Sequence, residues 1–158
     1  MPHQHLTTRT IPFADTDLAG IVHFTHFLRY MEDTEHDFYR VLGLSVHAET
    51  ETGWIGWPRI EVQCRYVRPL RFEEVVEVQL LVRGRTEATI DYAFLFRRPS
   101  DAPPRPLAFG AMTVACAARD TDRDTLKSHP IPTSFADRIK AAPAEMLAPW
   151  ERGIAGDG

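Results

Sequence analysis

The 158-residue sequence has few cysteines and no long apolar run. Its two cysteines, Cys64 and Cys116, each fall in a strand-like apolar pattern without Cys/His spacing suited to zinc, which predicts buried free thiols. No apolar stretch approaches the roughly 20 residues of a membrane helix. The first residues lack the basic and apolar regions of a signal peptide. We therefore expect a chain of the reducing cytoplasm with no membrane partner.

An excess of positive charge is also absent, because the net charge is −4. Nucleic-acid binding favours a basic face, so nucleic acid is not expected as a partner. Residues 1–58 hold three arginines and eight acidic residues, a net −5, whereas residues 59–98 hold eight arginines and six acidic residues, a net +2. The length and the 44% hydrophobic content predict a single globular domain over 1–158.

A strand-like run over 6–13 precedes the only long helical pattern. Apolar residues recur there at gaps of three, four and seven, and this stripe consists of Phe27, Leu28, Met31, Phe38, Val41 and Leu42. Thr25 is the expected N-cap and Gly43 the expected stop, which predicts a helix of about 18 residues. Glu35 falls near the stripe and is expected to be a partly buried, paired acid.

After a linker over 45–52, alternation with a period of two predicts antiparallel strands over 59–66, 76–83, 89–96 and 107–119. A short helix is expected over 133–142 and a mobile tail over 143–158, which leaves a core of about 7–140. This order predicts an α+β fold with the sheet around one helix. One helix would leave Leu81, Ala93 and Leu95 uncovered, which predicts a homo-oligomer, a dimer or a tetramer built from dimers, joined edge to edge.

The segment 13–24 joins the first strand to the helix and carries Asp15, Asp17, Gly20 and His23. A helix start offers unpaired N–H groups and the positive end of a macrodipole. A carboxylate beside such donors can attack a carbonyl or activate water while the donors stabilise the oxyanion. Two aspartates are also common as turn and capping residues at such a junction, so spacing alone leaves both interpretations open.

The motif Asp-x-Asp-x-x-Gly-Ile-Val at 15–22, between a strand and one long helix, resembles that of the hotdog-fold acyl-CoA thioesterases. Within them, the chain is most similar to the 4-hydroxybenzoyl-CoA thioesterase family over about residues 9–139. The segments 53–58 and 68–72 match that family's G-x-x-G-x-P turn and its "RPL" strand end. The resemblance implies a hotdog fold, an acyl-CoA substrate, no cofactor and a site formed between two subunits.

In that family the second aspartate of the motif is the catalytic carboxylate, which implies that Asp17 acts as nucleophile or general base. The resemblance assigns the oxyanion donor to the backbone N–H of Phe24, with His23 in support, although relatives often carry Tyr or His at position 24. Asp15 is expected to order the loop by accepting local N–H bonds. The expected substrate contacts are Gly20, Trp57 and Pro58.

Three other interpretations were compared with this one. A metal site from the loop aspartates with His23 and His26 is disfavoured, because histidines at a helix start more commonly serve as caps and thioester cleavage needs no metal. A haloacid-dehalogenase phosphatase is rejected, because its fold needs alternating βαβ units. A hotdog domain that binds acyl-CoA without hydrolysing it stays open. The acyl group, and CoA versus acyl carrier protein as its carrier, also stay open.

Overall fold

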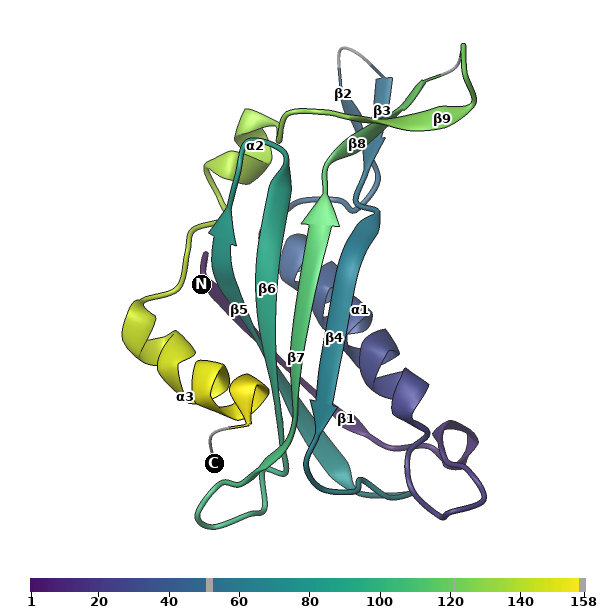
Figure 1. Cartoon of the computed structure of the whole chain (residues 1–158), viewed down its shortest axis with the longest axis vertical. Helices are drawn as coiled ribbons and strands as arrows, with labels where there is room; N and C mark the ends of the chain where they lie inside the picture. Colours follow the sequence, from purple (N-terminus) through teal and green to yellow (C-terminus); the bar gives the residue numbers. More distant parts are fainter. Residues whose placement is uncertain (51–52, 121, 157–158) are drawn as a thin grey trace.

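The computed structural model describes residues 1–50, 53–120 and 122–156; the last two residues of the predicted linker, 51–52, lie outside these ranges. Its main sheet has five antiparallel strands in the order β1-β5-β6-β7-β4, with α1 on one face and α3 on the other (Figure 1). A second sheet, in the order β2-β3-β8-β9, extends beyond one end of the first. The elements are β1 (Gln4–Thr10), η1 (Phe13–Asp15), α1 (Phe24–Val41), β2 (Ala48–Thr50), β3 (Gly53–Gly56), β4 (Arg59–Tyr66), β5 (Val75–Arg85), β6 (Thr89–Arg97), β7 (Pro106–Ala115), β8 (Ala117–Asp120), β9 (Thr125–Ser128), α2 (Thr133–Ala136) and α3 (Ala144–Ala155).

Alternation in the strands decides which side chains meet α1. The apolar residues of β5 and β6 that were predicted to share one face are buried in the core beside α1: Val76, Val78, Leu80, Val82, Ile90, Tyr92, Phe94 and Phe96. Because neighbouring side chains on a strand point to opposite faces, this pattern gives the sheet one continuous apolar surface for the helix. The predicted α+β class, an antiparallel sheet around one long helix, is confirmed.

The buried stripe of α1 differs from the predicted one. Leu28 and Val41 are 37% and 61% exposed, whereas Tyr30 and Tyr39 are 1% and 0% exposed. Each of these two tyrosine hydroxyls donates a hydrogen bond to a carboxylate, which allows the ring to be buried with its polar end satisfied. The prediction counted only apolar residues and so left out these tyrosine–carboxylate pairs. The buried face of the helix is therefore rotated toward the tyrosines relative to the predicted face.

The strand predicted over 59–66 is present as β4, but its apolar side chains are largely exposed. Ile60, Val62 and Tyr66 are 61%, 41% and 45% exposed. The reason is the position of β4 at the edge of the main sheet, where only β7 pairs with it. The predicted half-buried pattern is therefore wrong for this strand within one chain.

The segment expected to be mobile instead contains α3, which covers the outer face of the main sheet. Leu147 and Trp150 of α3 are 9% and 4% exposed and belong to a second apolar cluster with Leu81, Ala93 and Phe109. The expectation of a mobile tail is wrong for this helix. The face that the sequence suggested was uncovered is covered by the chain itself, so that argument for an oligomer fails.

Two prolines in this segment do not prevent the helix. Pro143 occupies the N-cap, where no backbone N–H is needed. Pro149 lies inside α3 and removes one helical hydrogen bond, a cost that the burial of the apolar face offsets. The helix also approaches the sheet closely, because a Cβ at Gly153 would lie 2.0 Å from the Cζ atom of Phe109.

Three further boundaries differ from the prediction. The strand expected over 107–119 is interrupted at Cys116, where the chain passes from the main sheet into the second one. The expected linker 45–52 contains β2. The helix expected over 133–142 ends at Ala136, because the following segment pairs elsewhere: Ala142 N donates to Val82 O (2.7 Å). Among the described residues, no helix is both long and apolar enough to cross a membrane.

Candidate active site

Backbone hydrogen bonds hold the loop between β1 and α1 at both of its ends. His23 N donates to Asp15 O (2.9 Å), which closes the loop on itself. Val22 N donates to Leu70 O (2.7 Å), which ties the loop to the segment after β4. The loop is thus a defined structure that carries the motif aspartates to the start of α1.

Asp17 forms a tight turn within this loop and is exposed. Its Oδ1 atom accepts a hydrogen bond from Ala19 N (2.8 Å), and its carbonyl accepts one from Gly20 N (2.9 Å). Gly20 has a φ of +74°, a conformation that residues with a side chain rarely adopt. Among the described residues, Oδ2 of Asp17 has no hydrogen-bond partner. One oxygen of this carboxylate therefore orders the turn, and the other is free for water or substrate.

Asp15 makes different contacts from those expected. Its carboxylate does not take local N–H bonds among the described residues but accepts a hydrogen bond from the hydroxyl of Tyr30 (2.5 Å) through Oδ2. Its Oδ1 atom lies 3.4 Å from Nδ1 of His26. The local N–H acceptor is Asp17, whereas the Asp15 side chain joins the loop to α1.

The helix α1 begins at Phe24, and His23, not the expected Thr25, is its N-cap. The Nδ1 atom of His23 accepts a hydrogen bond from Thr25 N (3.4 Å) and lies 2.7 Å from its hydroxyl. Within the described part of the chain, the N–H of Phe24 has no acceptor. This N–H is one of the unpaired donors at the positive end of the helix macrodipole.

A cavity of about 350 Å³ lies beside this helix start. Both Asp17 and Phe24 line it. The hydroxyl of Tyr66 donates to Phe24 O (2.9 Å), and its ring lies edge-on to that of Phe27, with centroids 5.2 Å apart. The other lining residues are Ile21, Val22, Val67, Arg68, Pro69 and Leu70. Asp17, with its free carboxylate oxygen, and Phe24, the first residue of the helix, therefore line one mostly apolar cavity.

Tyr66 and the segment 68–70 are among the lining residues that sequence reasoning did not assign to the site. The segment was recognised only as a family-like strand end, and Tyr66 only as the last residue of a strand. The segment lies at the cavity because Val22 N of the loop donates to Leu70 O (2.7 Å), and Tyr66 because its hydroxyl donates to Phe24 O (2.9 Å). Pairing between distant segments of this kind leaves no mark in the local pattern.

Trp57 and Pro58 lie elsewhere in the fold. Trp57 is 4% exposed, and its ring centroid lies 5.8 Å from that of Tyr39 and 4.9 Å from that of Phe135. Pro58 joins β3 to β4, and its carbonyl accepts a hydrogen bond from Ala115 N (2.9 Å). Neither residue lines the cavity beside Asp17.

The loop, the helix start and the sheet together match a known family. The model of the Thioesterase-like superfamily matches residues 11–139, and the chain belongs to that superfamily. The family expected from the motif at 15–22 is thereby confirmed.

Named relatives agree with this membership. The chain is 32% identical over 85 residues to a 1,4-dihydroxy-2-naphthoyl-CoA hydrolase of Thermosynechococcus vestitus, a segment that covers 51% of this chain and 58% of that relative. The fold of this chain is similar to that of a 1,4-dihydroxy-2-naphthoyl-CoA thioesterase from Synechocystis. The two share 18% identity with a TM-score of 0.74, over 86% of this chain and 95% of the other. A 4-hydroxybenzoyl-CoA thioesterase, crystallised as an Asp-to-Asn mutant with 4-hydroxybenzoyl-CoA, gives 12% identity, a TM-score of 0.75 and coverage of 87% and 99%.

Proposed function

We propose that this chain is an acyl-CoA thioesterase that uses Asp17 as its catalytic carboxylate and the N–H of Phe24 as an oxyanion donor. The observation that carries the proposal is that Asp17 and Phe24 line the same apolar cavity at the start of α1. Membership of the superfamily supports the reaction class. The relative crystallised as an Asp-to-Asn mutant with its substrate supports the choice of a carboxylate.

The chemistry needs few groups. Asp17 either removes a proton from water, whose oxygen then attacks the thioester carbon, or attacks that carbon itself. The carbonyl oxygen becomes an oxyanion, which the N–H of Phe24 stabilises as a positioned hydrogen-bond donor. The C–S bond then breaks and CoA leaves as a thiolate, which takes the proton held by Asp17 in the general-base route or a proton from solvent water in the nucleophile route. If Asp17 is the nucleophile, water hydrolyses the resulting anhydride in a second step. His23 supports the donor indirectly, because it caps the helix that presents it.

We further propose an aromatic acyl group. Phe24, Phe27 and Tyr66 line the cavity, and aromatic rings can pack against a planar acyl group in stacked or edge-on arrangements. Two of the similar proteins above act on naphthoyl or benzoyl thioesters by their names, in keeping with this substrate class.

We also propose that the enzyme is a homo-oligomer joined along β4. The exposed side chains of Ile60 and Val62, on a strand that pairs on one side only, form the kind of edge that proteins seldom leave open to solvent. Tyr66, at the end of the same strand, lines the cavity. A second copy along β4 would therefore border the site as well.

The test is thiol release from a panel of short-chain, long-chain and aromatic acyl-CoA thioesters, by the wild type and Asp17→Asn. Asn has nearly the same size and keeps an oxygen for the turn, so folding should be retained. Turnover should fall by about 10²–10⁴, the scale for a lost general base, while acyl-CoA binding persists. Asp37→Asn is the matched control, because Asp37 is a partly exposed aspartate of α1 that pairs with His5 and Arg40 and does not line the cavity.

The outcomes separate the alternatives. A wild type that binds acyl-CoA but releases no thiol would be a binding module. If the wild type releases thiol and Asp17→Asn is equally active, then Asp17 is not the catalytic carboxylate. Faster release from long aliphatic than from aromatic thioesters would refute the aromatic substrate class while leaving the reaction class intact.

A further inference from the structure

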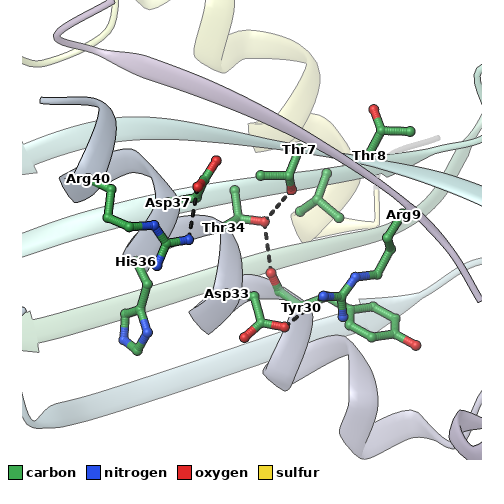
Figure 2. A pocket seen from close by; sticks show the side chains of 10 residues that line it. Thr7, Thr8, Arg9, Tyr30, Asp33, Thr34, His36, Asp37 and Arg40 are labelled. Carbon is green, nitrogen blue, oxygen red and sulfur yellow. Dashed lines mark hydrogen bonds and ion pairs between the residues drawn. The ribbon is translucent and has the colours of Figure 1, made fainter.

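A polar cleft of about 390 Å³ separates β1 from α1 on the side of the helix away from β4. Figure 2 shows Arg9 reaching from β1 across this cleft toward Asp33 and Tyr30 of α1. Arg9 pairs with Asp33 (2.8 Å), and its guanidinium carbon lies 4.4 Å from the centroid of the Tyr30 ring. These contacts join β1 to α1 across the cleft.

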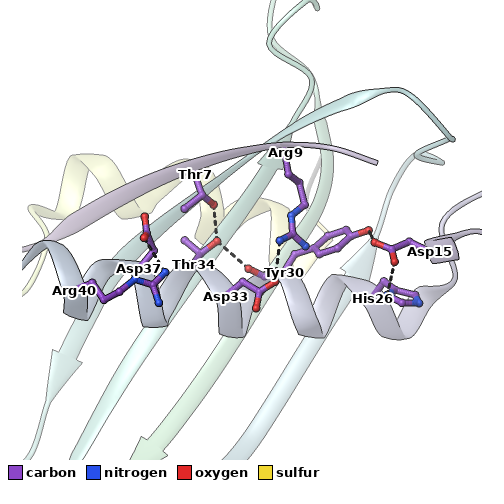
Figure 3. Close-up of polar contacts among 9 residues, drawn as sticks. All are labelled: Thr7, Arg9, Asp15, His26, Tyr30, Asp33, Thr34, Asp37 and Arg40. Carbon is purple, nitrogen blue, oxygen red and sulfur yellow. Dashed lines mark hydrogen bonds and ion pairs between the residues drawn. The ribbon is translucent and has the colours of Figure 1, made fainter. Parts of the chain in front are cut away.

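The same ring connects the cleft to the candidate active site. Figure 3 shows the Tyr30 hydroxyl directed toward Asp15, which in turn contacts His26 in the first turn of α1. The hydroxyl donates to Oδ2 of Asp15 at 2.5 Å, and the Asp15 side chain is only 17% exposed. Asp15 stands two residues before Asp17 and closes the loop through its carbonyl. The contacts thus run from β1 through α1 to the loop that carries the carboxylate.

We propose that Tyr30 and Asp15 are positioning residues that set the Asp17 loop against α1. The inference rests on the proposed function, in which Asp17 acts from the loop and the N–H of Phe24 acts from the helix. These two groups belong to different elements, so their separation depends on how the loop is attached to the helix. Tyr30 lies in the same rigid helix as Phe24, and its hydrogen bond fixes a loop residue beside Asp17 relative to that helix.

The surroundings of Tyr30 keep this contact intact. The residue is 1% exposed, and its ring is enclosed by Arg9 and by Phe27, whose centroid lies 6.2 Å away. Burial, followed by the hydrogen bond to the Asp15 carboxylate, raises the pKa of Tyr30 well above its usual value. The hydroxyl therefore remains a donor at neutral pH. A misplacement of about 1 Å in a reacting group can cost about 10²-fold in rate, so this single bond has a measurable consequence.

Tyr30→Phe tests the proposal, because it retains the ring and its packing and removes only the donor. Relative to the wild type, kcat should fall about 10- to 100-fold while KM changes by less than about threefold. In hydrogen–deuterium exchange, a peptide covering residues 13–23 should exchange faster, since the loop has lost its link to the helix.

Tyr39→Phe is the matched control. Tyr39 is a buried tyrosine of the same helix, and its hydroxyl donates to Glu35 (3.1 Å) and contacts that of Tyr92 (2.8 Å), outside the candidate site. The Tyr39→Phe variant should lower the unfolding midpoint about as much as Tyr30→Phe does. It should leave kcat and the hydrogen–deuterium exchange of the peptide 13–23 at wild-type values. This comparison separates positioning from a general loss of stability.

Two results would overturn the proposal. One is a Tyr30→Phe enzyme whose kcat stays within about twofold of the wild type, and the other is a kcat loss that Tyr39→Phe reproduces. If the wild type releases no thiol from any thioester, the proposed function fails. In that case the hydrogen–deuterium exchange of the peptide 13–23 still tests whether Tyr30 attaches the loop to α1. Unchanged exchange in Tyr30→Phe would refute that attachment.

Discussion

Trp150 provides the sharpest test of the packing of α3, the element that the sequence pattern did not predict. Its side chain is 4% exposed in a cluster with Leu81 and Phe109. The indole Nε1 atom donates to Gly110 O (2.7 Å), and the guanidinium carbon of Arg83 lies 4.6 Å from the ring centroid. One residue therefore supplies apolar burial, a hydrogen bond and a cation–π contact to the outer face of the sheet.

These contacts give the expected magnitudes. Trp150→Ala removes the whole ring and should lower the free energy of unfolding by about 3–5 kcal/mol, as for other buried aromatic residues. Trp150→Phe keeps most of the apolar area and loses the hydrogen bond, so about 1–3 kcal/mol is expected. Urea unfolding followed by circular dichroism measures both, because fluorescence would change with the removed indole.

Trp54→Ala is the control for this experiment. Trp54 is 51% exposed and stacks on His47, with ring centroids 4.4 Å apart, so its loss should cost about 0.5 kcal/mol or slightly more. If Trp150→Ala costs no more than Trp54→Ala, then α3 does not pack on the sheet. The outer face would in that case be uncovered, as the sequence pattern indicated, and would need another partner.

Three further predictions concern stability, the thiols and assembly. Burial raises the pKa of Glu35 from its ordinary value of 4.5 to about 7 in spite of its ion pair with Arg59, so folding favours the protonated form. The stability of the wild type relative to Glu35→Gln should therefore be greatest below about pH 4.5 and decline as the pH rises to about 7. Urea midpoints that run parallel with pH in the two proteins would contradict this assignment. Burial also raises the pKa of both Cys64 and Cys116 to about 11, so changing both to Ala should lower stability modestly and leave thiol release unchanged; an inactive but folded double variant would require a thiol mechanism. Light scattering should show a dimer or larger assembly that Val62→Arg shifts toward the monomer, and a stable wild-type monomer at micromolar concentration would refute assembly along β4.

Much of the fold follows from local patterns. Alternation in β5 and β6 predicts which side chains meet the helix, because the period of a strand fixes the face of each residue. The long helical period predicts α1 to within two residues at its start and about one at its end. Glu35, placed beside the stripe by its position alone, is paired with Arg59 as expected, but it is fully buried where partial burial was expected.

The chemical centre of the candidate site was also readable locally. Asp17 and Phe24 lie within eight residues, and a strand, a loop and a helix start are all encoded in the adjoining sequence, whereas Gly20, expected to contact substrate, shapes the turn and does not line the cavity. The turn at Gly20 and the free N–H of Phe24 follow from backbone geometry that short segments determine. Membership of the superfamily then agrees with the motif.

What only the tertiary structure decided are the contacts between distant segments. The sequence indicated neither that α3 covers the outer face nor that β4 lies open at the edge, because burial depends on which elements become neighbours. Trp57, expected at the substrate site, packs in the core with Phe135, 78 positions along the chain. The bond from Tyr30 to Asp15 arises only when the loop folds back on α1. Local propensity and period are properties of a segment, whereas these contacts are properties of the packed chain.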